Sequence, residues 1–366
     1  MPFPPRPGTG PARRFRLPRS RSLRYAVLGS AIGLTAAAAV GPVRSAVSAA
    51  EPVHVEQAAV TQLLQRPLGT AFGQQSQAEA DLGDGTTLAA WELKDGVKEF
   101  HLTAAPLTWE TEPGRTKQAL AFNGHLPGPV IRVNQGDKVR IVVKNDMAKP
   151  TAVHWHGMEL PNDQDGVPML TQHDIEPGQS FTYEWTAVST GTHWYHSHED
   201  GDQEGRGLYG ALEVVPALGD IPAERDFRIM TGDGPLGFVF NAKSYPATTP
   251  LAAKVGERVH IRLIGTGPEM FHAIHIHGGY FTVVAQDGRP LAVPQQMDTV
   301  TVGIGQTYDL IWVPVRTGKW MIHCHVFSHS EVASGMTGMV TIADVQPATL
   351  PLPGLPGVTD SQQQHN

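Results

Sequence analysis

The chain has very little cysteine: Cys324 is the single one among 366 residues. One cysteine excludes a disulfide within the chain, and it excludes the structural zinc sites that are built from two to four thiolates. Residues 96–346 also lack the sustained 3.6-residue apolar period of long amphipathic helices. The sequence therefore argues against a disulfide scaffold and against a helical bundle.

Acidic residues are absent from residues 1–50, which contain eight arginines. Seven of them precede an apolar run over 25–40, and small residues follow at 45–50, which is the order of an export signal. Arg13-Arg14-Phe15 indicates twin-arginine export. The run is short for a membrane span, so a retained anchor is the minor alternative. We expect a secreted or periplasmic protein with no membrane association.

Loss of this signal changes the formal net charge from −7 to −15. A protein with that excess of acid repels the phosphate backbone of nucleic acids. Nucleic acid is therefore not expected as a partner.

The middle of the chain repeats itself with an offset of about 120–130 residues. Residues 135–143 resemble residues 255–263, and each stretch precedes a His-x-His-Gly. Residues 190–198 likewise match residues 317–325. The repeat indicates two units that share one plan.

Apolar residues alternate with polar ones in short segments such as 139–143 and 181–185, and Gly, Pro, Asn and Asp separate the segments. This pattern predicts an all-β protein of two Greek-key β-sandwiches. The predicted organisation is an export signal at 1–50, an N-terminal extension at 51–95 with one short helix near 60–64, domains at 96–216 and 217–346, and a loose tail at 347–366.

Ten of the 17 histidines fall in four tight clusters, and the cysteine lies in the last of them. Two imidazoles of a His-x-His lie on one strand face about 7 Å apart, which suits neighbouring ions. Strand alternation sends Cys324 to one face and its two histidine neighbours to the other, so one segment can serve two metal sites. The clusters are His154 and His156; His196 and His198; His272, His275 and His277; and His323, Cys324, His325 and His329.

Imidazole suits copper, and a thiolate with two imidazoles and a weak axial thioether suits a blue copper centre. Met336 is the candidate axial ligand, and Met339 is the second candidate. Met336 is supported by the internal repeat, in which Gly335-Met336 aligns with Gly207-Leu208 of the first unit.

The four clusters, in this order, resemble the copper signatures of multicopper oxidases, and two units make the chain similar to the small two-domain laccases. The resemblance covers about residues 100–345. One departure from the family pattern is the distance along the chain from His329 to Met336, which is two residues longer than the family's usual spacing. It implies cupredoxin-like domains and four copper ions per chain, one type 1, one type 2 and two type 3. Carried over by position, it puts the type 1 copper on His272, Cys324, His329 and Met336; the type 2 copper on His154 and His275; one type 3 copper on His156, His196 and His325; and the other on His198, His277 and His323.

The resemblance also implies a homotrimer in which facing units of neighbouring subunits complete each trinuclear cluster. Spacing alone leaves an interface within one chain equally open. Asp165 resembles the acid that delivers protons in relatives, and its alternative role is that of a turn residue before Gly166. Glu199 and Asp200 are weaker candidates, and His173 and His193 are candidates for outer partners of the ligands.

The function that the resemblance implies is laccase-like oxidation of phenols and aromatic amines, coupled to reduction of O2 to water. A metal-ion oxidase, acting on Fe(II), Cu(I) or Mn(II), is the main alternative; Glu331 is the one acid near the expected type 1 centre, and no methionine-rich insert is present. A copper nitrite reductase is less favoured because its cysteine belongs in the first domain. A non-enzymatic copper protein would need neither two units nor all ten histidines.

Overall fold

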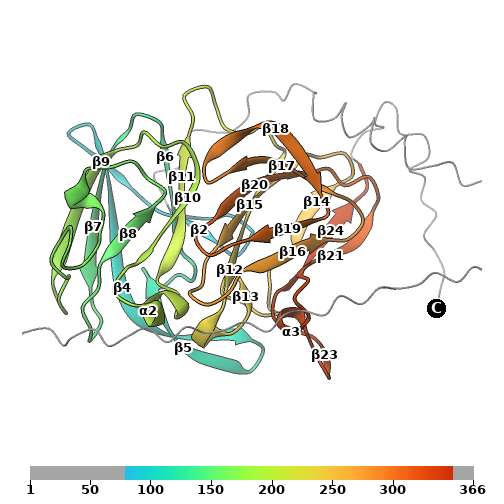
Figure 1. Ribbon diagram of the computed structural model, residues 1–366, viewed down its shortest axis with the longest axis horizontal. Helices are drawn as coiled ribbons and strands as arrows, with labels where there is room; N and C mark the ends of the chain where they lie inside the picture. Colours follow the sequence, from blue (N-terminus) through green and yellow to red (C-terminus); the bar gives the residue numbers. More distant parts are fainter. Residues whose placement is uncertain (1–78, 349–366) are drawn as a thin grey trace, which may run out of the picture. The chain divides into compact units, whose positions relative to one another are not determined.

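The computed structural model describes residues 79–348 (Figure 1). The export signal, the short helix near 60–64 and residues 349–366 of the expected tail lie outside the described residues. Within residues 79–348, no helix has the length and apolar character needed to cross a membrane.

The first sandwich pairs a six-stranded sheet with a five-stranded one. The six-stranded sheet has the order β1 (Ala80–Asp81), β2 (Thr87–Leu88), β6 (Gly128–Asn134), β11 (Tyr209–Val215), β10 (Gly191–Ser197) and β8 (Val153–His156). The other consists of β3 (Glu92–Lys94), β4 (Val97–Glu112), β7 (Lys138–Asn145) and β9 (Ser180–Thr186), with β5 (Arg115–Phe122) paired to β4. Strands β1 to β3 lie in the segment that the sequence analysis assigned to an extension, and β2 and β3 pair with β6 and β4.

The second sandwich repeats this plan. One sheet has the order β13 (Val239–Phe240), β12 (Arg225–Gly232), β15 (Val259–Gly265), β20 (Thr307–Trp312), β17 (Phe281–Gln286) and β18 (Arg289–Met297). The other has the order β14 (Leu251–Lys254), β24 (Val340–Gln346), β21 (Gly318–Cys324), β16 (His272–Ile276) and β19 (Thr299–Val302). A small hairpin joins β22 (Glu331–Val332) to β23 (Gly335–Met336).

The described helices are single turns between strands, namely η1 (Asn162–Gln164), α2 (Gly201–Gly205), η2 (Gly234–Leu236) and α3 (Phe327–Ser330). Alternate residues of each strand fill the cores, since successive side chains point to opposite faces of a sheet. In β7, for example, Val139, Ile141 and Val143 are buried. The prediction of an all-β fold with two cupredoxin-like sandwiches is confirmed.

A buried ion network joins the two sandwiches. Arg228 of β12 donates from Nε to Glu213 of β11 at 2.6 Å, and Arg132 of β6 and Arg262 of β15 both donate to Asp220, at 2.6 Å and 2.5 Å. Burial alone would raise the pKa of Glu213, but the charges of Arg228 and Arg262 lower it to about 2. The network therefore connects β6 and β11 of the first sandwich to β12 and β15 of the second, and removing one partner would leave an uncompensated buried charge.

Candidate metal centres

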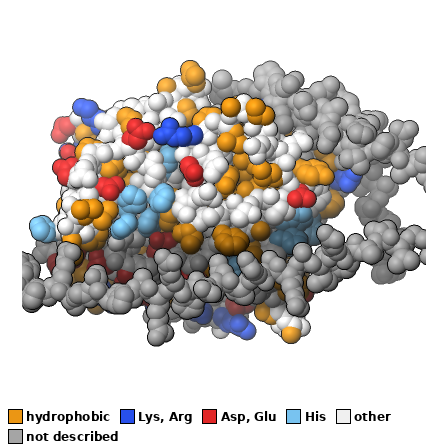
Figure 2. Space-filling model, in the orientation of Figure 1, with side chains coloured by type: hydrophobic (Ala, Val, Ile, Leu, Met, Phe, Trp, Pro, Cys, Tyr) orange, Lys and Arg blue, Asp and Glu red, His pale blue; other side chains and the backbone are white. Residues whose placement is uncertain are grey.

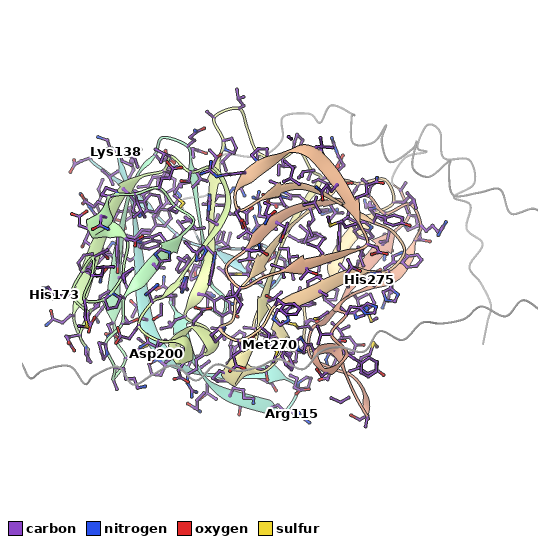
Figure 3. The ribbon with its side chains drawn as sticks, viewed as in Figure 1. Arg115, Lys138, His173, Asp200, Met270 and His275 are labelled. Carbon is purple, nitrogen blue, oxygen red and sulfur yellow. The ribbon has the colours of Figure 1, made fainter. Side chains whose placement is uncertain are left out.

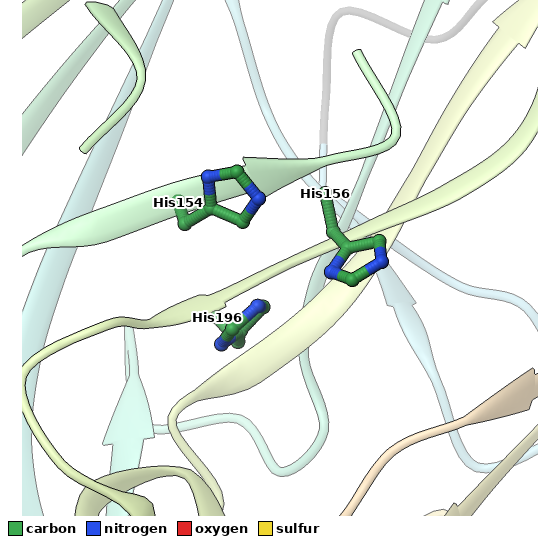
Figure 4. A group of neighbouring side chains, drawn as sticks. All are labelled: His154, His156 and His196. Atoms are coloured by element: carbon green, nitrogen blue, oxygen red, sulfur yellow. The ribbon is translucent and has the colours of Figure 1, made fainter. Parts of the chain in front are cut away.

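Four histidines of the first sandwich gather on one face of the β8–β10 pair, and we call them the first quartet. His154 lies directly opposite His196 in the antiparallel register. The ring centroid of His154 lies 5.5 Å from those of His156 and His196 (Figure 4). It lies 5.4 Å from the ring centroid of His198. The rings therefore converge more closely than the 7 Å spacing expected along a strand.

The second sandwich reproduces this arrangement on β16 and β21. His275 lies opposite His323 in the register. Its ring centroid is 5.0 Å from that of His277, 5.6 Å from that of His323 and 5.5 Å from that of His325. We call these four residues the second quartet. Figure 2 shows histidine side chains gathered at two places on this face, one over β8 and the other over β16 and β21.

Cys324 lies on the opposite face of β21 from the second quartet, as strand alternation predicts. Its sulfur is fully buried and lies 3.9 Å from Nδ1 of His272 and 3.5 Å from Nδ1 of His329. The two Nδ1 atoms are 3.2 Å apart. We call these three residues the thiolate centre.

The donor atoms fit metal ions. Those of His154, His156 and His196, those of His275, His277 and His323, and those of the thiolate centre each lie within 4.8 Å of one another. Nε2 of His196 is a buried ring nitrogen with no hydrogen-bond partner in the described structure. A buried polar atom rarely stays unpaired, so this lone pair is well suited to a metal.

Four of the imidazoles also have a protonation state that suits metal ligands. Burial lowers the pKa of His156 to about 4 and lowers the pKa values of His154, His277 and His323 below their usual range. These rings are therefore neutral near pH 7 and offer a lone pair. Soft thiolate beside imidazole favours copper at the thiolate centre, and imidazole alone also suits copper.

The second nitrogen of several of these rings contacts a backbone oxygen. Nδ1 of His154 lies 2.8 Å from the carbonyl of Asp165, and Nδ1 of His275 lies 2.8 Å from the carbonyl of Asp298. Such contacts fix the ring and leave the other nitrogen free for a metal. Asp165 also brings a carboxylate oxygen to 3.4 Å from the same nitrogen of His154.

The two candidate axial methionines lie in different surroundings. The residues that lengthen the spacing after His329 form the β22–β23 hairpin, and Met336 on β23 is 49% exposed. Met339 is fully buried in the same core cluster as Cys324. Its carbonyl accepts the Cys324 N–H at 3.0 Å, and its N–H donates to the His329 carbonyl at 2.8 Å.

The weaker candidates all belong to the first sandwich. Glu199 and Asp200 follow His198, and Asp200 caps α2 by accepting the Gln203 N–H. His193 is buried on β10, with Nε2 3.1 Å from the carbonyl of Thr190. His173 is exposed between β8 and β9, and Figure 3 shows it at the opposite side of the view from His275.

Sequence reasoning missed three residues that contact the candidate ligands. Phe238 stacks on His329 with ring centroids 3.9 Å apart. Asp233 and Glu204 bring carboxylates to His272 and His196. No spacing signal could have revealed them, because each lies on a different element from the histidine that it meets.

The two quartets do not meet within the described part of one chain. No ring of one quartet contacts a ring of the other in residues 79–348. The neighbour of His156 from the second sandwich is the turn between β19 and β20, where a Cβ added to Gly305 would lie 2.8 Å from Cε1 of His156.

Comparison with known proteins identifies the class to which this fold and these sites belong. Sequence models of the multicopper oxidase family match residues 103–218 and 221–345. The chain therefore belongs to the multicopper oxidase family.

Among solved structures, the blue copper oxidase from Nitrosomonas europaea is 37% identical, with 68% of this chain and 85% of that chain covered and a TM-score of 0.63. The multicopper oxidase mgLAC is 34% identical, with coverage of 73% and 91% and a TM-score of 0.64. Laccase-2 of Botryotinia fuckeliana is 30% identical over 66% of this chain and 48% of its own length. A probable nitrite reductase-hydroxylamine oxidoreductase fusion protein of Kuenenia stuttgartiensis is 32% identical over 69% of this chain and 32% of its own length. The chain thus spans less than half the length of these two curated relatives.

Proposed function

We propose that the chain is a laccase-like oxidase that couples one-electron oxidation of phenols or aromatic amines to reduction of O2 to water. The observation that carries this proposal is the segment 323–325, which connects the thiolate centre to the second quartet through the peptide of Cys324. In that segment His323 contributes to one group of donor atoms and Cys324 to another. A redox enzyme that takes electrons at one centre and uses them at another needs such a connection.

Four copper ions per chain are proposed, with the type 1, type 2 and type 3 ligands assigned as in the sequence analysis. Copper, when bound, supplies the one-electron redox chemistry at the thiolate centre and the site of O2 reduction at the histidines. Burial holds the pKa values of His154, His156, His277 and His323 below their usual range. Backbone carbonyls fix the second nitrogens of His154 and His275. Asp165 is proposed to deliver protons, and its carboxylate oxygen 3.4 Å from Nδ1 of His154 supports that role.

A homotrimer is proposed because each chain supplies only separate halves of an eight-histidine site. The separation of the quartets within one chain supports completion of the site by a second copy. Closed cyclic assembly of identical chains satisfies this need, and the resemblance to the two-domain laccases sets the proposed number of subunits at three.

The surroundings of the thiolate centre support an aromatic donor. Met270 and Phe271 directly precede His272, and Phe327 lies two residues before His329. These side chains are 42%, 61% and 71% exposed. Exposed large apolar side chains are typical of sites that bind apolar partners.

Oxidation of a metal ion is the second candidate. Glu269 and Glu331 are exposed carboxylates on the segments that carry Met270 and His329. Carboxylates are ligands for hard metal ions, so they would suit Fe(II) or Mn(II) at this edge.

Secretion through the twin-arginine route is also proposed, on the strength of residues 1–50. Fractionation of a host that expresses the full chain tests it. Replacement of Arg13 and Arg14 by Lys should keep the protein inside the cell.

O2 uptake with a panel of donors tests the proposed activity. The panel holds a phenol, a non-phenolic dye, bilirubin, Fe(II) and Cu(I), with nitrite under anaerobic conditions as a further arm. The proposal predicts O2 consumption with the phenol and the dye. Uptake with Fe(II) or Cu(I) alone supports the metal-ion oxidase, and nitrite turnover without O2 uptake contradicts the oxidase.

A further inference from the structure

Two buried carboxylates bind one loop from opposite sides. The loop comprises residues 266–271 and connects β15 to β16, so it leads directly into His272. Glu204 belongs to α2 of the first sandwich, and Asp233 precedes η2 of the second. Figure 3 labels Met270 on this loop and Asp200 at the start of α2, which lie at the same lower side of the view.

Glu204 connects the first quartet to the loop. Its Oε1 accepts the N–H of Gly267 at 3.2 Å, and its Oε2 lies 3.1 Å from Nδ1 of His196. The same Nδ1 is 2.9 Å from the carbonyl of Ser197. With two acceptors around it, Nδ1 is the nitrogen that donates, and Nε2, which has no hydrogen-bond partner, is the nitrogen available to a metal.

Asp233 connects the thiolate centre to the same loop. It accepts the N–H of Glu269 at 3.3 Å and the N–H of Met270 at 2.8 Å. Its Oδ2 lies 3.6 Å from Nε2 of His272, which is an ion-pair distance and longer than a hydrogen bond, and Asp233 is 2% exposed. The negative charge of Asp233 therefore favours the proton of His272 on Nε2. The lone pair is then on Nδ1, which faces Cys324.

The loop has little room to move between the two carboxylates. Gly267 has φ of +100°, and a Cβ there would lie 2.7 Å from Oδ1 of Asp233. On the other side, a Cβ added to Gly205 of α2 would lie 2.9 Å from Pro235 and 3.3 Å from Pro268. Neither glycine has room for a Cβ, so the loop packs closely against Asp233 and α2, and close-packed elements can transmit strain.

We propose that Glu204 and Asp233 are positioning residues that orient His196 and His272, and that the loop that they share couples the first quartet to the thiolate centre of the same chain. This inference rests on the proposed copper sites. In the proposed trimer those two centres belong to different clusters, so the loop links neighbouring active sites.

Each carboxylate uses both of its oxygens, which makes an amide substitution informative. A glutamine at 204 has one acceptor oxygen and cannot accept from Gly267 and His196 together. An asparagine at 233 likewise cannot accept the loop N–H groups and present an anion to His272. The variants Glu204→Gln and Asp233→Asn therefore break the arrangement while keeping side-chain volume.

The test measures copper affinity by competition with a chelator, together with the reduction potential and EPR signature of the blue centre, in the full-length protein. Each variant should bind copper at its own centre about 10- to 100-fold more weakly. Asp233→Asn should shift the blue reduction potential upward, because loss of a nearby anion destabilises Cu(II) relative to Cu(I). Glu204→Gln should alter the blue EPR signature although Glu204 does not touch that centre.

Asp202→Asn is the matched control, since Asp202 is exposed on the same helix α2 and pairs with Arg206. It should leave all three measurements unchanged. Wild-type copper affinity in both variants would overturn the positioning roles, and an unchanged blue signature in Glu204→Gln would overturn the coupling.

Misfolding of a variant and failure of the proposed function can each be distinguished from failure of this inference. If Glu204→Gln does not fold, Glu204→Asp replaces it, because it keeps two oxygens but withdraws them by one methylene and should weaken copper binding at the first quartet. Wild-type affinity in Glu204→Asp would again overturn the role of Glu204. If the wild-type protein binds no copper, the proposed function itself fails. If the wild-type protein binds copper and the variants bind it equally well, only this inference fails.

Discussion

The sulfur of Cys324 lies 3.5 Å from Nδ1 of His329, on the buried side of a strand whose other face carries His323. One strand therefore presents a thiolate to one centre and an imidazole to another, with a single peptide between them.

Substitution of Cys324 by Ser should abolish the blue colour and the oxidation of donors while the histidine quartets still bind copper. A hydroxyl is a hard and weakly acidic ligand that does not replace a thiolate on copper. Absorption spectroscopy, copper analysis and O2 uptake check this prediction. Ser328→Ala, a change at an exposed residue of α3, serves as the control. Donor turnover at the wild-type rate in Cys324→Ser would contradict the proposed electron path.

The two methionines should differ in their effect on stability. Met339 is buried beside Cys324, so Met339→Ala should lower the free energy of unfolding by about 2–5 kcal/mol. Met336 is half exposed, so Met336→Ala should change it by no more than about 0.5 kcal/mol. Chemical denaturation of the metal-free protein measures both values.

Substitutions of Met336 and Met339 also identify the axial ligand. If Met336 is the axial ligand, as its alignment with Leu208 predicts, Met336→Leu shifts the blue reduction potential without loss of stability. A potential identical to that of the wild type excludes Met336 and leaves Met339.

The separation of the quartets predicts complementation between subunits. A variant with His154 and His156 replaced by Ala lacks half of the first quartet, and a variant with His275 and His277 replaced by Ala lacks half of the second. Each alone should be inactive, because every interface then lacks ligands. Mixed trimers, made by co-expression, should regain part of the activity where two intact halves face each other.

Sedimentation supplies the control for that experiment, since the active species should be a trimer. A fully active monomer, or inactive mixed trimers, would contradict a shared site.

The metal-free protein should lose stability as the pH falls from about 6.5 to about 4. Burial lowers the pKa of His156 from 6.5 to about 4, so the unfolded chain binds a proton in this window that the folded chain does not. Stability then rises with pH across the window and falls on acidification. Thermal unfolding at a series of pH values measures the slope, and His156→Gln should make it shallower. An unchanged slope in that variant would show that His156 does not contribute to this pH dependence.

Local patterns in the sequence were enough to predict the fold and the grouping of most candidate ligands. His154 and His156 share a face because strands have a period of two, and the same period separates Cys324 from His323. The repeated units then predicted that each sandwich carries its own pair of His-x-His motifs.

Contacts between distant segments could not be predicted in this way. Glu204 reaches His196 because α2 turns back over β10, and Asp233 reaches His272 because β12 ends beside the loop before β16. The exposure of Met336 likewise depends on the β22–β23 hairpin, whose residues look like a simple insertion in the sequence.

Copper content and colour of the purified, metal-replete protein decide whether the proposed copper sites exist. We expect about four copper ions per chain and an intense blue absorption band that disappears in Cys324→Ser. A colourless protein, or one that holds a single copper ion per chain, would contradict the proposal.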